Sequence, residues 1–167
     1  MQQDFRVSRK NAVWVADITY IRTQSGWLYL AVVMDLYARK IVGWALASRM
    51  RASLVRSALN MAIIARQPAL ELIVHTGQGS QYASDDYLQL LAKHQLTASM
   101  GGKGNYYDNA VMERFFLSLK LERVWQTNYA NHQEAIRDIS HYIVAFYNAY
   151  RLRSTLGYCR PISLKQI

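Results

Sequence analysis

The stretch "VWVADITYI" at residues 13–21 decides the fold of this chain, because it combines a β-strand pattern with one charged side chain. Its β-branched and aromatic residues favour extended backbone. Asp17 stands in the middle of the run, where burying a carboxylate costs free energy unless a cation or hydrogen-bond donors meet it. Two interpretations of Asp17 are open: an ion pair with one of the many arginines, or a ligand for a hard divalent cation such as Mg²⁺ or Mn²⁺.

The residues that follow extend the strand pattern. Apolar runs at 27–36 ("WLYLAVVMDL") and 40–47 ("KIVGWALA") are separated by connections short enough for hairpins, so we predict an antiparallel meander of three strands. Beyond it the periodicity alternates between helices and short strands. We expect a helix capped by Ser53 at 53–68, a strand at 72–74, a helix capped by Ser84, a strand at 96–99, and helices at 110–125 and 132–150.

This order of elements predicts the α/β, ribonuclease H-like fold: three antiparallel strands, then alternating helices and strands, in a mixed five-stranded sheet flanked by helices. A length of 167 residues with 51% hydrophobic residues suits one domain over 1–167. We expect a flexible amino-terminal tail at 1–10 and a basic carboxy-terminal tail at 151–167.

The charge is strongly positive, since 20 Lys and Arg outnumber 11 Asp and Glu to give +9. Such a field favours polyanions, nucleic acid among them. The single cysteine, Cys159, excludes an intramolecular disulfide and a four-cysteine zinc site. The longest apolar run, at 27–34, is far shorter than the roughly 20 residues that a membrane span needs. We therefore predict an intracellular protein without membrane contact.

A second acid follows the glycine-rich segment "MGGKGNYYDN" at 100–109, which we interpret as a mobile loop. Glu113 is expected to open the next helix, beside an apolar stripe of Met112, Phe115, Phe116 and Leu119. Lys120 comes seven residues later, about 10 Å along the same face. That pair would suit a metal ligand and a phosphate contact, although an ordinary surface glutamate is the other interpretation.

Several motifs together resemble the OrfB-type transposases of bacterial insertion sequences, whose catalytic core belongs to the retroviral-integrase superfamily. The motifs are "VWVADITYI", "GWLYLAVVMDL", "IVGWA", "GSQYAS", "KGNYYDNAVMERFF" and "LGY", and they run from about Asn11 to the end of the chain. The resemblance implies three acids, D, D and E, that bind two divalent ions, with a Lys or Arg seven residues beyond the Glu. Asp17 matches the first acid, Glu113 the third and Lys120 the basic position.

The second acid is missing. The family motif resembles "HSDRGSQY" or "HTDQGSQY", and this chain has "HTGQGSQY" at 75–82, with Gly77 placed 35 residues before Glu113 as the family's second Asp would be. Gly77 is thus either a vacated metal-ligand position or a turn residue, as Gly79 is expected to be. We interpret His75 as a hydrogen-bonded loop residue, and Asp35, Asp85, Asp86 and Asp108 as unable to replace the lost carboxylate. Asp35 is the least implausible substitute of the four.

The resemblance implies metal-dependent DNA strand cleavage and transfer of the freed 3′-hydroxyl to target DNA, that is, DNA integration and recombination. Its partners would be element ends and target DNA, with a homo-oligomer expected and a dimer favoured, in the nucleoid of the bacterial cytoplasm. We expect the upstream helix-turn-helix region of the family to be absent from this chain. Predicted DNA contacts are Lys103, Tyr106, Tyr107, Arg114, Lys120, Arg151 and Arg153.

Gly77 predicts that this copy holds at most one Mg²⁺ or Mn²⁺ ion well and is inactive or only weakly active. The alternative is a catalytically inactive DNA-binding remnant, or an inhibitory subunit of a transposase. A ribonuclease H-like enzyme that cleaves RNA is a further alternative.

Overall fold

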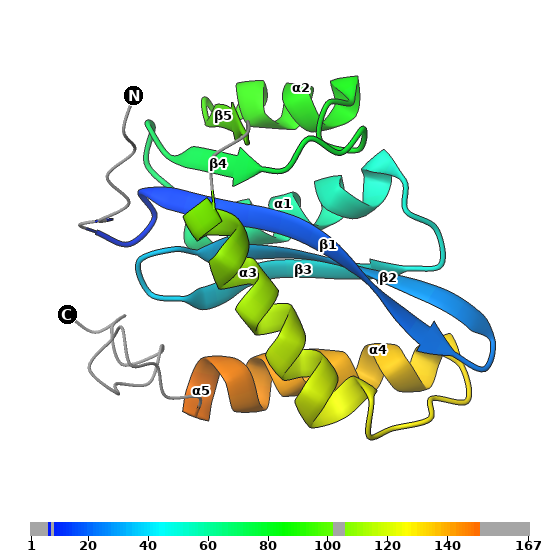
Figure 1. Ribbon diagram of the computed structural model, residues 1–167. Helices are drawn as coiled ribbons and strands as arrows, with labels where there is room; N and C mark the ends of the chain where they lie inside the picture. The colour runs from blue at the N-terminus through cyan, green and yellow to red at the C-terminus, as the bar shows by residue number, and fades with distance from the viewer. Residues whose placement is uncertain (1–6, 8, 102–105, 151–167) are drawn as a thin grey trace.

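A computed structural model describes residues 7, 9–101 and 106–150 of the chain. A five-stranded sheet forms its centre, in the order β3-β2-β1-β4-β5 (Figure 1). The predicted meander is confirmed, since β1 pairs antiparallel with β2, and β2 with β3. β4 joins β1 in parallel, and β5 joins β4 in the same sense. The strands are β1 (Val13–Thr23), β2 (Gly26–Asp35), β3 (Lys40–Ala47), β4 (Ile73–Thr76) and β5 (Thr97–Met100).

Helices cover both faces of the sheet (Figure 1). One layer contains α1 (Ala52–Arg66) and α2 (Asp85–Lys93). The other contains α3 (Tyr106–Leu119), which continues into the π-helical turn η1 (Lys120–Val124), and α4 (His132–His141), which continues through η2 (Tyr142–Tyr147) into α5 (Asn148–Tyr150). Among the described residues, no helix is long and apolar enough to cross a bilayer.

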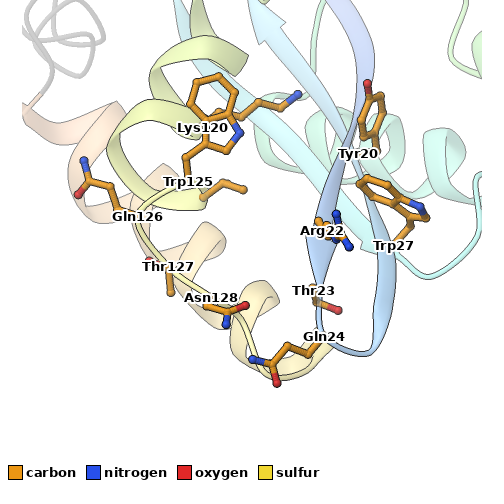
Figure 2. A pocket seen from close by; sticks show the side chains of 11 residues that line it. Tyr20, Arg22, Thr23, Gln24, Trp27, Lys120, Trp125, Gln126, Thr127 and Asn128 are labelled. Atoms are coloured by element: carbon orange, nitrogen blue, oxygen red, sulfur yellow. The ribbon is translucent and has the colours of Figure 1, made fainter.

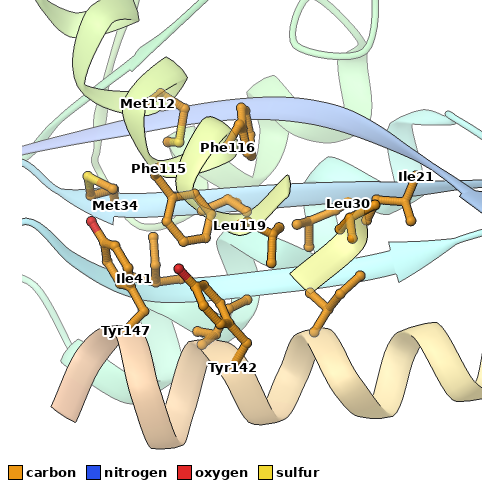
Figure 3. Close-up of a cluster of buried hydrophobic side chains, with 14 of the residues drawn as sticks. Ile21, Leu30, Met34, Ile41, Met112, Phe115, Phe116, Leu119, Tyr142 and Tyr147 are labelled. Atoms are coloured by element: carbon orange, nitrogen blue, oxygen red, sulfur yellow. The ribbon is translucent and has the colours of Figure 1, made fainter. Parts of the chain in front are cut away.

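Alternate residues of β1 enter two separate cores. Trp14 and Ala16 are buried with the side chains of α1 and α2. Val15 and Ile21 are buried with those of α3 and α4 (Figure 3). Because side chains alternate along a strand, Asp17 lies on the same face as Val15, the face that α3 crosses.

The boundaries of the middle elements differ slightly from the predicted ones. Ser84 caps α2 as expected, with its Oγ accepting a hydrogen bond from the Tyr87 amide at 3.3 Å. The cap predicted at Ser53 is wrong, because α1 begins at Ala52 after Arg51, which forms no side-chain cap. β4 and β5 both end later than expected, at Thr76 and Met100.

α3 begins earlier than the sequence indicated. Its first residue is Tyr106, so residues 106–109 are helical and the loop predicted at 100–109 is wrong there. Glu113 consequently lies in the middle of α3 and does not open it. The apolar stripe is confirmed, since Met112, Phe115, Phe116 and Leu119 are all buried. The packing of this stripe outweighs the turn preference of the Asn- and Gly-rich segment before it.

For the last helix the sequence predicts an apolar stripe of Ile136, Ile139, Ile143, Phe146 and Tyr150, and this prediction is partly wrong. Ile139 and Ile143 are buried, but Ile136 and Phe146 are exposed by 36% and 41%. Tyr147 is buried in place of Phe146. The exchange of Phe146 for Tyr147 falls within η2, where a π-helical turn holds more residues than an α-helical turn and shifts the buried face by one position. The side chain of Tyr150 is outside the described part, as are 151–167 and most of the tail predicted at 1–10.

Candidate acidic metal site

Asp17 and Glu113 approach one another across the interface of β1 and α3. Burial raises the pKa of Asp17 most, the Ile18 amide lowers it, and the negative charge of Glu113 raises it again. The Ile18 N–H donates to Oδ1 of Asp17 at 2.8 Å. Within the described residues, no cation contributes to this shift. The fold therefore brings the first and third acids of the predicted set near one another.

Gly77 directly follows β4, the strand that pairs with β1. β4 runs parallel to β1 with Val15 opposite His75 and Ala16 opposite Thr76. Continued by one residue, this register places Gly77 opposite Asp17. Residues paired across neighbouring strands point to the same face of a sheet. A side chain at position 77 would thus project beside Asp17, toward the side of the sheet that α3 covers.

The backbone at Gly77 does not require glycine. Among the described residues, Gly26 is the glycine with positive φ, so neither Gly77 nor Gly79 occupies the left-handed region. A Cβ at position 77 would meet nothing within 4 Å. The interpretation of Gly77 as a turn residue, and the expectation of such freedom at Gly79, are not supported. An aspartate at position 77 would fit without strain.

The other acids considered as substitutes lie elsewhere. Asp35 is fully buried opposite Trp14, on the face of the sheet that carries α1. Burial raises its pKa, although the Asn11 and Tyr37 amides donate to it and the charge of Arg66 lowers that pKa. Asp35 therefore cannot reach the face where Asp17 lies. Asp85 and Asp86 are exposed first-turn acids of α2, and the side chain of Asp108 is outside the described part.

His75 belongs to β4 and not to the loop where the sequence suggested it. Its side chain is buried, with Nδ1 at 3.1 Å from Oγ of Ser99 on the neighbouring strand β5. This contact agrees with a hydrogen-bonded structural histidine.

Lys120, the predicted basic partner of Glu113, is the first residue of η1. Its Nζ lies over the ring of Tyr20, 4.9 Å from the centroid, so it reaches β1 beyond Asp17. Arg114 is exposed on α3. Of the other predicted DNA contacts, Lys103, Arg151 and Arg153 are outside the described residues, and so are the side chains of Tyr106 and Tyr107. All these DNA-binding roles stay predictions.

A groove next to Lys120 was missed by the sequence reasoning. It has a volume of about 750 Å³ and separates the end of the β1–β2 hairpin from the segment after α3 (Figure 2). Arg22 and Trp27 from the hairpin, and Trp125 from that segment, are among its lining residues. The signal available in the sequence was Trp27 at the start of the predicted strand at 27–36. We call it the hairpin groove.

The two acids present would suit a hard divalent cation, and the predicted second acid is not among them. Carboxylate oxygens are the preferred ligands of Mg²⁺, and both acids come from regular secondary structure. No cluster of three or more His, Cys, Asp or Glu side chains exists among the described residues. The open space beside Asp17 at position 77 is where a third carboxylate would complete the site.

Comparisons with known proteins identify the family of this chain. The Integrase core domain family matches residues 7–106. The chain is 44% identical over 161 residues to the transposase InsF of insertion sequence IS3A from Escherichia coli (strain K12), covering 96% of this chain and 56% of that protein. The transposase of insertion sequence element IS904 from Lactococcus lactis is also 44% identical, covering 96% of this chain and 64% of its own length. The chain thus spans little more than half the length of these relatives.

Two solved structures share its fold. The catalytic core domain of HTLV-2 integrase, in a dimeric form with magnesium, has a TM-score of 0.70 at 15% identity and covers 95% of this chain and 99% of that one. A chain of the simian T-cell lymphotropic virus intasome has a TM-score of 0.76 at 18% identity and covers 94% of this chain and 55% of that one. The predicted ribonuclease H-like fold is confirmed.

Proposed function

This chain belongs to the integrase core domain family, and from that premise we propose that it is the catalytic core of an insertion-sequence transposase, impaired by Gly77. Its reaction would be metal-dependent cleavage of DNA strands and transfer of the freed 3′ ends to target DNA. The observation that carries the proposal is the approach of Asp17 and Glu113 beside the open space at position 77.

The two acids would act as ligands held on rigid elements. Asp17 is fixed on the central strand by the hydrogen bond from the Ile18 amide, and Glu113 is fixed by the buried stripe of α3. Divalent ions bound there would supply the charge that activates the attacking oxygen and stabilises the leaving oxygen in phosphoryl transfer. Lys120, two turns after Glu113, would hold a phosphate of the bound strand.

The loss of the second carboxylate weakens this site. Two acids in place of three hold less positive charge, so we propose that Mg²⁺ or Mn²⁺ binds at no more than one well-ordered position. The chemical step would then be severely slowed. Since a Cβ at position 77 meets no atom within 4 Å, the impairment should be reversible by one substitution.

The test is a cleavage assay on branched DNA that carries an unpaired strand, with Mn²⁺, comparing the natural protein with Gly77→Asp. We expect Gly77→Asp to cleave at least about 100-fold faster, because even indirect partners of metal ligands change activity by 10- to 100-fold. Gly77→Asn is the matched control, since it adds the same volume without a negative charge. It should stay as slow as the natural protein.

If Gly77→Asp stays inert while it still binds DNA, the chain is an inactive remnant or an inhibitory subunit. An RNA–DNA hybrid in the same assay separates the remaining alternative. Faster cleavage of the hybrid's RNA strand than of branched DNA would identify a ribonuclease and overturn the proposal. We also propose a homo-oligomer, with a dimer favoured, which light scattering of the purified protein would measure.

A further inference from the structure

We propose that the hairpin groove binds an unpaired segment of DNA, with Trp27 and Trp125 stacking on bases and Arg22 and Lys120 contacting phosphates. This inference rests on the proposed function, because it takes DNA as the substrate. It adds a second binding surface, beyond the acidic site, and assigns it a specific form of DNA.

The chemistry of the groove favours a single strand. Trp27 is 49% exposed and Trp125 is 64% exposed, although large apolar rings are normally covered. Arg22 and Lys120 line the same groove, and no Asp or Glu is among its lining residues. Aromatic rings that stack on bases, together with cations that follow the backbone, are the combination that binds single-stranded nucleic acid. Paired bases would offer Trp27 and Trp125 only their edges.

The walls of the groove are held in place before any ligand binds. The Gln24 amide donates to the carbonyl of Tyr129 at 2.9 Å, and the Ser25 hydroxyl donates to the carbonyl of Ala130 at 3.1 Å. These bonds tie the tip of the hairpin to the segment that forms the opposite wall. A preorganised wall lowers the entropy lost on binding.

The aromatic and cationic side chains are also positioned by each other. Trp27 packs edge-on against Tyr20, with ring centroids 5.3 Å apart, and Lys120 covers the Tyr20 ring (Figure 2). Because Lys120 uses the ring of Tyr20, Trp27 and Trp125 are the rings that offer faces for stacking.

The groove lies within reach of the acidic site. Lys120 follows Glu113 by seven residues, which is about 10 Å along a helix, or about three nucleotides of a DNA strand. Lys120 and Trp125 are joined by a π-helical hydrogen bond of 2.8 Å, from the Trp125 amide to the Lys120 carbonyl. π-Helical turns often occur at functional sites. A strand that passes the acids can therefore continue into the groove.

The test measures anisotropy of fluorescently labelled oligo(dT) with the natural protein in EDTA, so that neither metal nor cleavage enters. Trp27→Ala and Trp125→Ala should each weaken binding about 5- to 150-fold, the range measured for loss of one stacked base. Trp27→Phe and Trp125→Phe should retain most of the affinity, because phenylalanine keeps a stacking face. Arg22→Ala should weaken binding and lower the salt dependence by about one counterion.

Two control variants lie outside the groove. Phe146→Ala removes a partly exposed ring from η2, and Arg56→Ala removes an exposed cation from α1. Both should bind oligo(dT) within about twofold of the natural protein. Circular dichroism and thermal unfolding of every variant separate loss of the groove from loss of the fold.

The inference is overturned if the two Trp→Ala variants fold and keep their affinity for oligo(dT), or if they lose as much affinity for a duplex of equal length. These results are independent of the cleavage assay. Weakened oligo(dT) binding together with an inert Gly77→Asp protein would support the groove and refute the proposed reaction. If the Trp→Ala variants bind oligo(dT) unchanged and the Gly77→Asp protein is active, the results would refute the groove and support the proposed reaction.

Discussion

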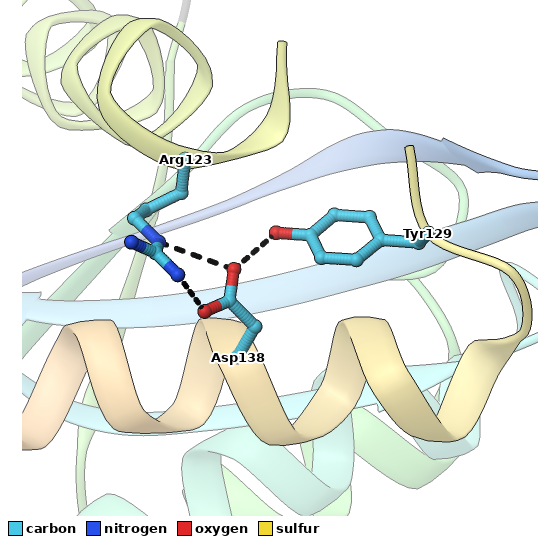
Figure 4. A network of polar contacts seen from close by, with 3 residues as sticks. All are labelled: Arg123, Tyr129 and Asp138. Carbon is cyan, nitrogen blue, oxygen red and sulfur yellow. Dashed lines mark hydrogen bonds and ion pairs between the residues drawn. The ribbon is translucent and has the colours of Figure 1, made fainter. Parts of the chain in front are cut away.

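Asp17 and Asp138 are two partly buried carboxylates whose surroundings act in opposite directions. Burial, followed by the charge of Glu113, raises the pKa of Asp17. Burial also acts to raise the pKa of Asp138, but hydrogen bonds from Arg123 and Tyr129 outweigh it, and the pKa is lowered. Figure 4 shows the arrangement, in which Arg123 forms two hydrogen bonds to Asp138 and the Tyr129 hydroxyl donates at 2.5 Å.

The difference distinguishes an acid that is balanced inside the fold from the acid that we propose as a metal ligand. Asp138 is balanced inside the fold, since a cation and a hydroxyl from neighbouring segments meet its oxygens. Asp17 faces another acid, and within the described residues no cation shifts its pKa. An unbalanced carboxylate in this position lowers the free energy of unfolding. A bound cation, or a metal ion that also binds phosphate, would restore it. The imbalance at Asp17 therefore supports the proposed metal site.

The largest effect should come from removing Asp17 in the restored protein. We expect Asp17→Asn, added to Gly77→Asp, to lower the rate of DNA cleavage at least about 100-fold, because a direct ligand matters more than an indirect one. Asp138→Asn in the same background should stay within a few-fold at a temperature where it is folded. Equal losses from both substitutions would erase the distinction between the two acids.

Metal binding should stabilise the restored protein next most strongly. At a concentration 100 times its dissociation constant, an ion adds about 2.7 kcal/mol to the free energy of unfolding. We expect Mg²⁺ or Mn²⁺ to raise the melting temperature of Gly77→Asp more than that of the natural protein, and EDTA to reverse the rise. Asp17→Asn in either background is the matching control, and its melting temperature should not change when metal is added. Two fully occupied ions in the natural protein would contradict the weakened site.

Asp138→Ala should lower the free energy of unfolding by about 1–3 kcal/mol, as expected when a hydrogen-bonded charge leaves its partners unsatisfied. Urea unfolding monitored by tryptophan fluorescence measures this change. Tyr129→Phe removes one of the hydrogen bonds and should cost less, about 1 kcal/mol. If Asp138→Ala leaves the free energy of unfolding unchanged, the network of Arg123, Tyr129 and Asp138 adds nothing to the stability of the fold.

In the absence of metal, Asp17→Asn should change the free energy of unfolding in the opposite direction to Asp138→Ala. It removes a charge that burial and Glu113 disfavour, so the free energy of unfolding at pH 7 should rise by on the order of 1 kcal/mol. Urea unfolding in EDTA tests it, with Asp138→Asn as the variant that must lose stability. Destabilisation by Asp17→Asn would mean that an unseen partner balances the charge.

The smallest effect is a difference in pH dependence. The folded-state pKa of Asp17 is raised above its ordinary value of 3.8, so its contribution to stability declines as the pH rises from 3.8 through the folded pKa. That of Asp138 is lowered, so its contribution is present above 3.8 and is lost as the pH falls through the folded pKa. The free energy of unfolding is measured against pH for the natural protein, Asp17→Asn and Asp138→Asn. Subtracting each variant's curve from that of the natural protein should show these two pH ranges. Subtraction is needed because the pKa of Asp35 is raised too.

Local patterns predicted most of the fold. The alternation in 13–47 indicated the meander, and the stripe from Met112 to Leu119 indicated the buried face of α3. The errors fall where tertiary packing overrides local preference. α3 extends back through Tyr106 although its first residues favour turns, and η2 buries Tyr147 in place of Phe146. A π-helical turn has no local sequence signature that periodicity can detect.

The sequence by itself determined which acids we propose as metal ligands and which position we propose as vacated, because the spacing around Asp17, Gly77 and Glu113 resembles the pattern of a known family. Only the tertiary structure decided that Gly77 has room for a side chain beside Asp17, and that Asp35 lies on the wrong face to replace it. It also brought Arg22, Trp27, Lys120 and Trp125 to one groove from distant parts of the chain. The physical reason is that strand pairing sets the face and register of each strand, and helix packing against the sheet sets the neighbours of Lys120. No single segment encodes either.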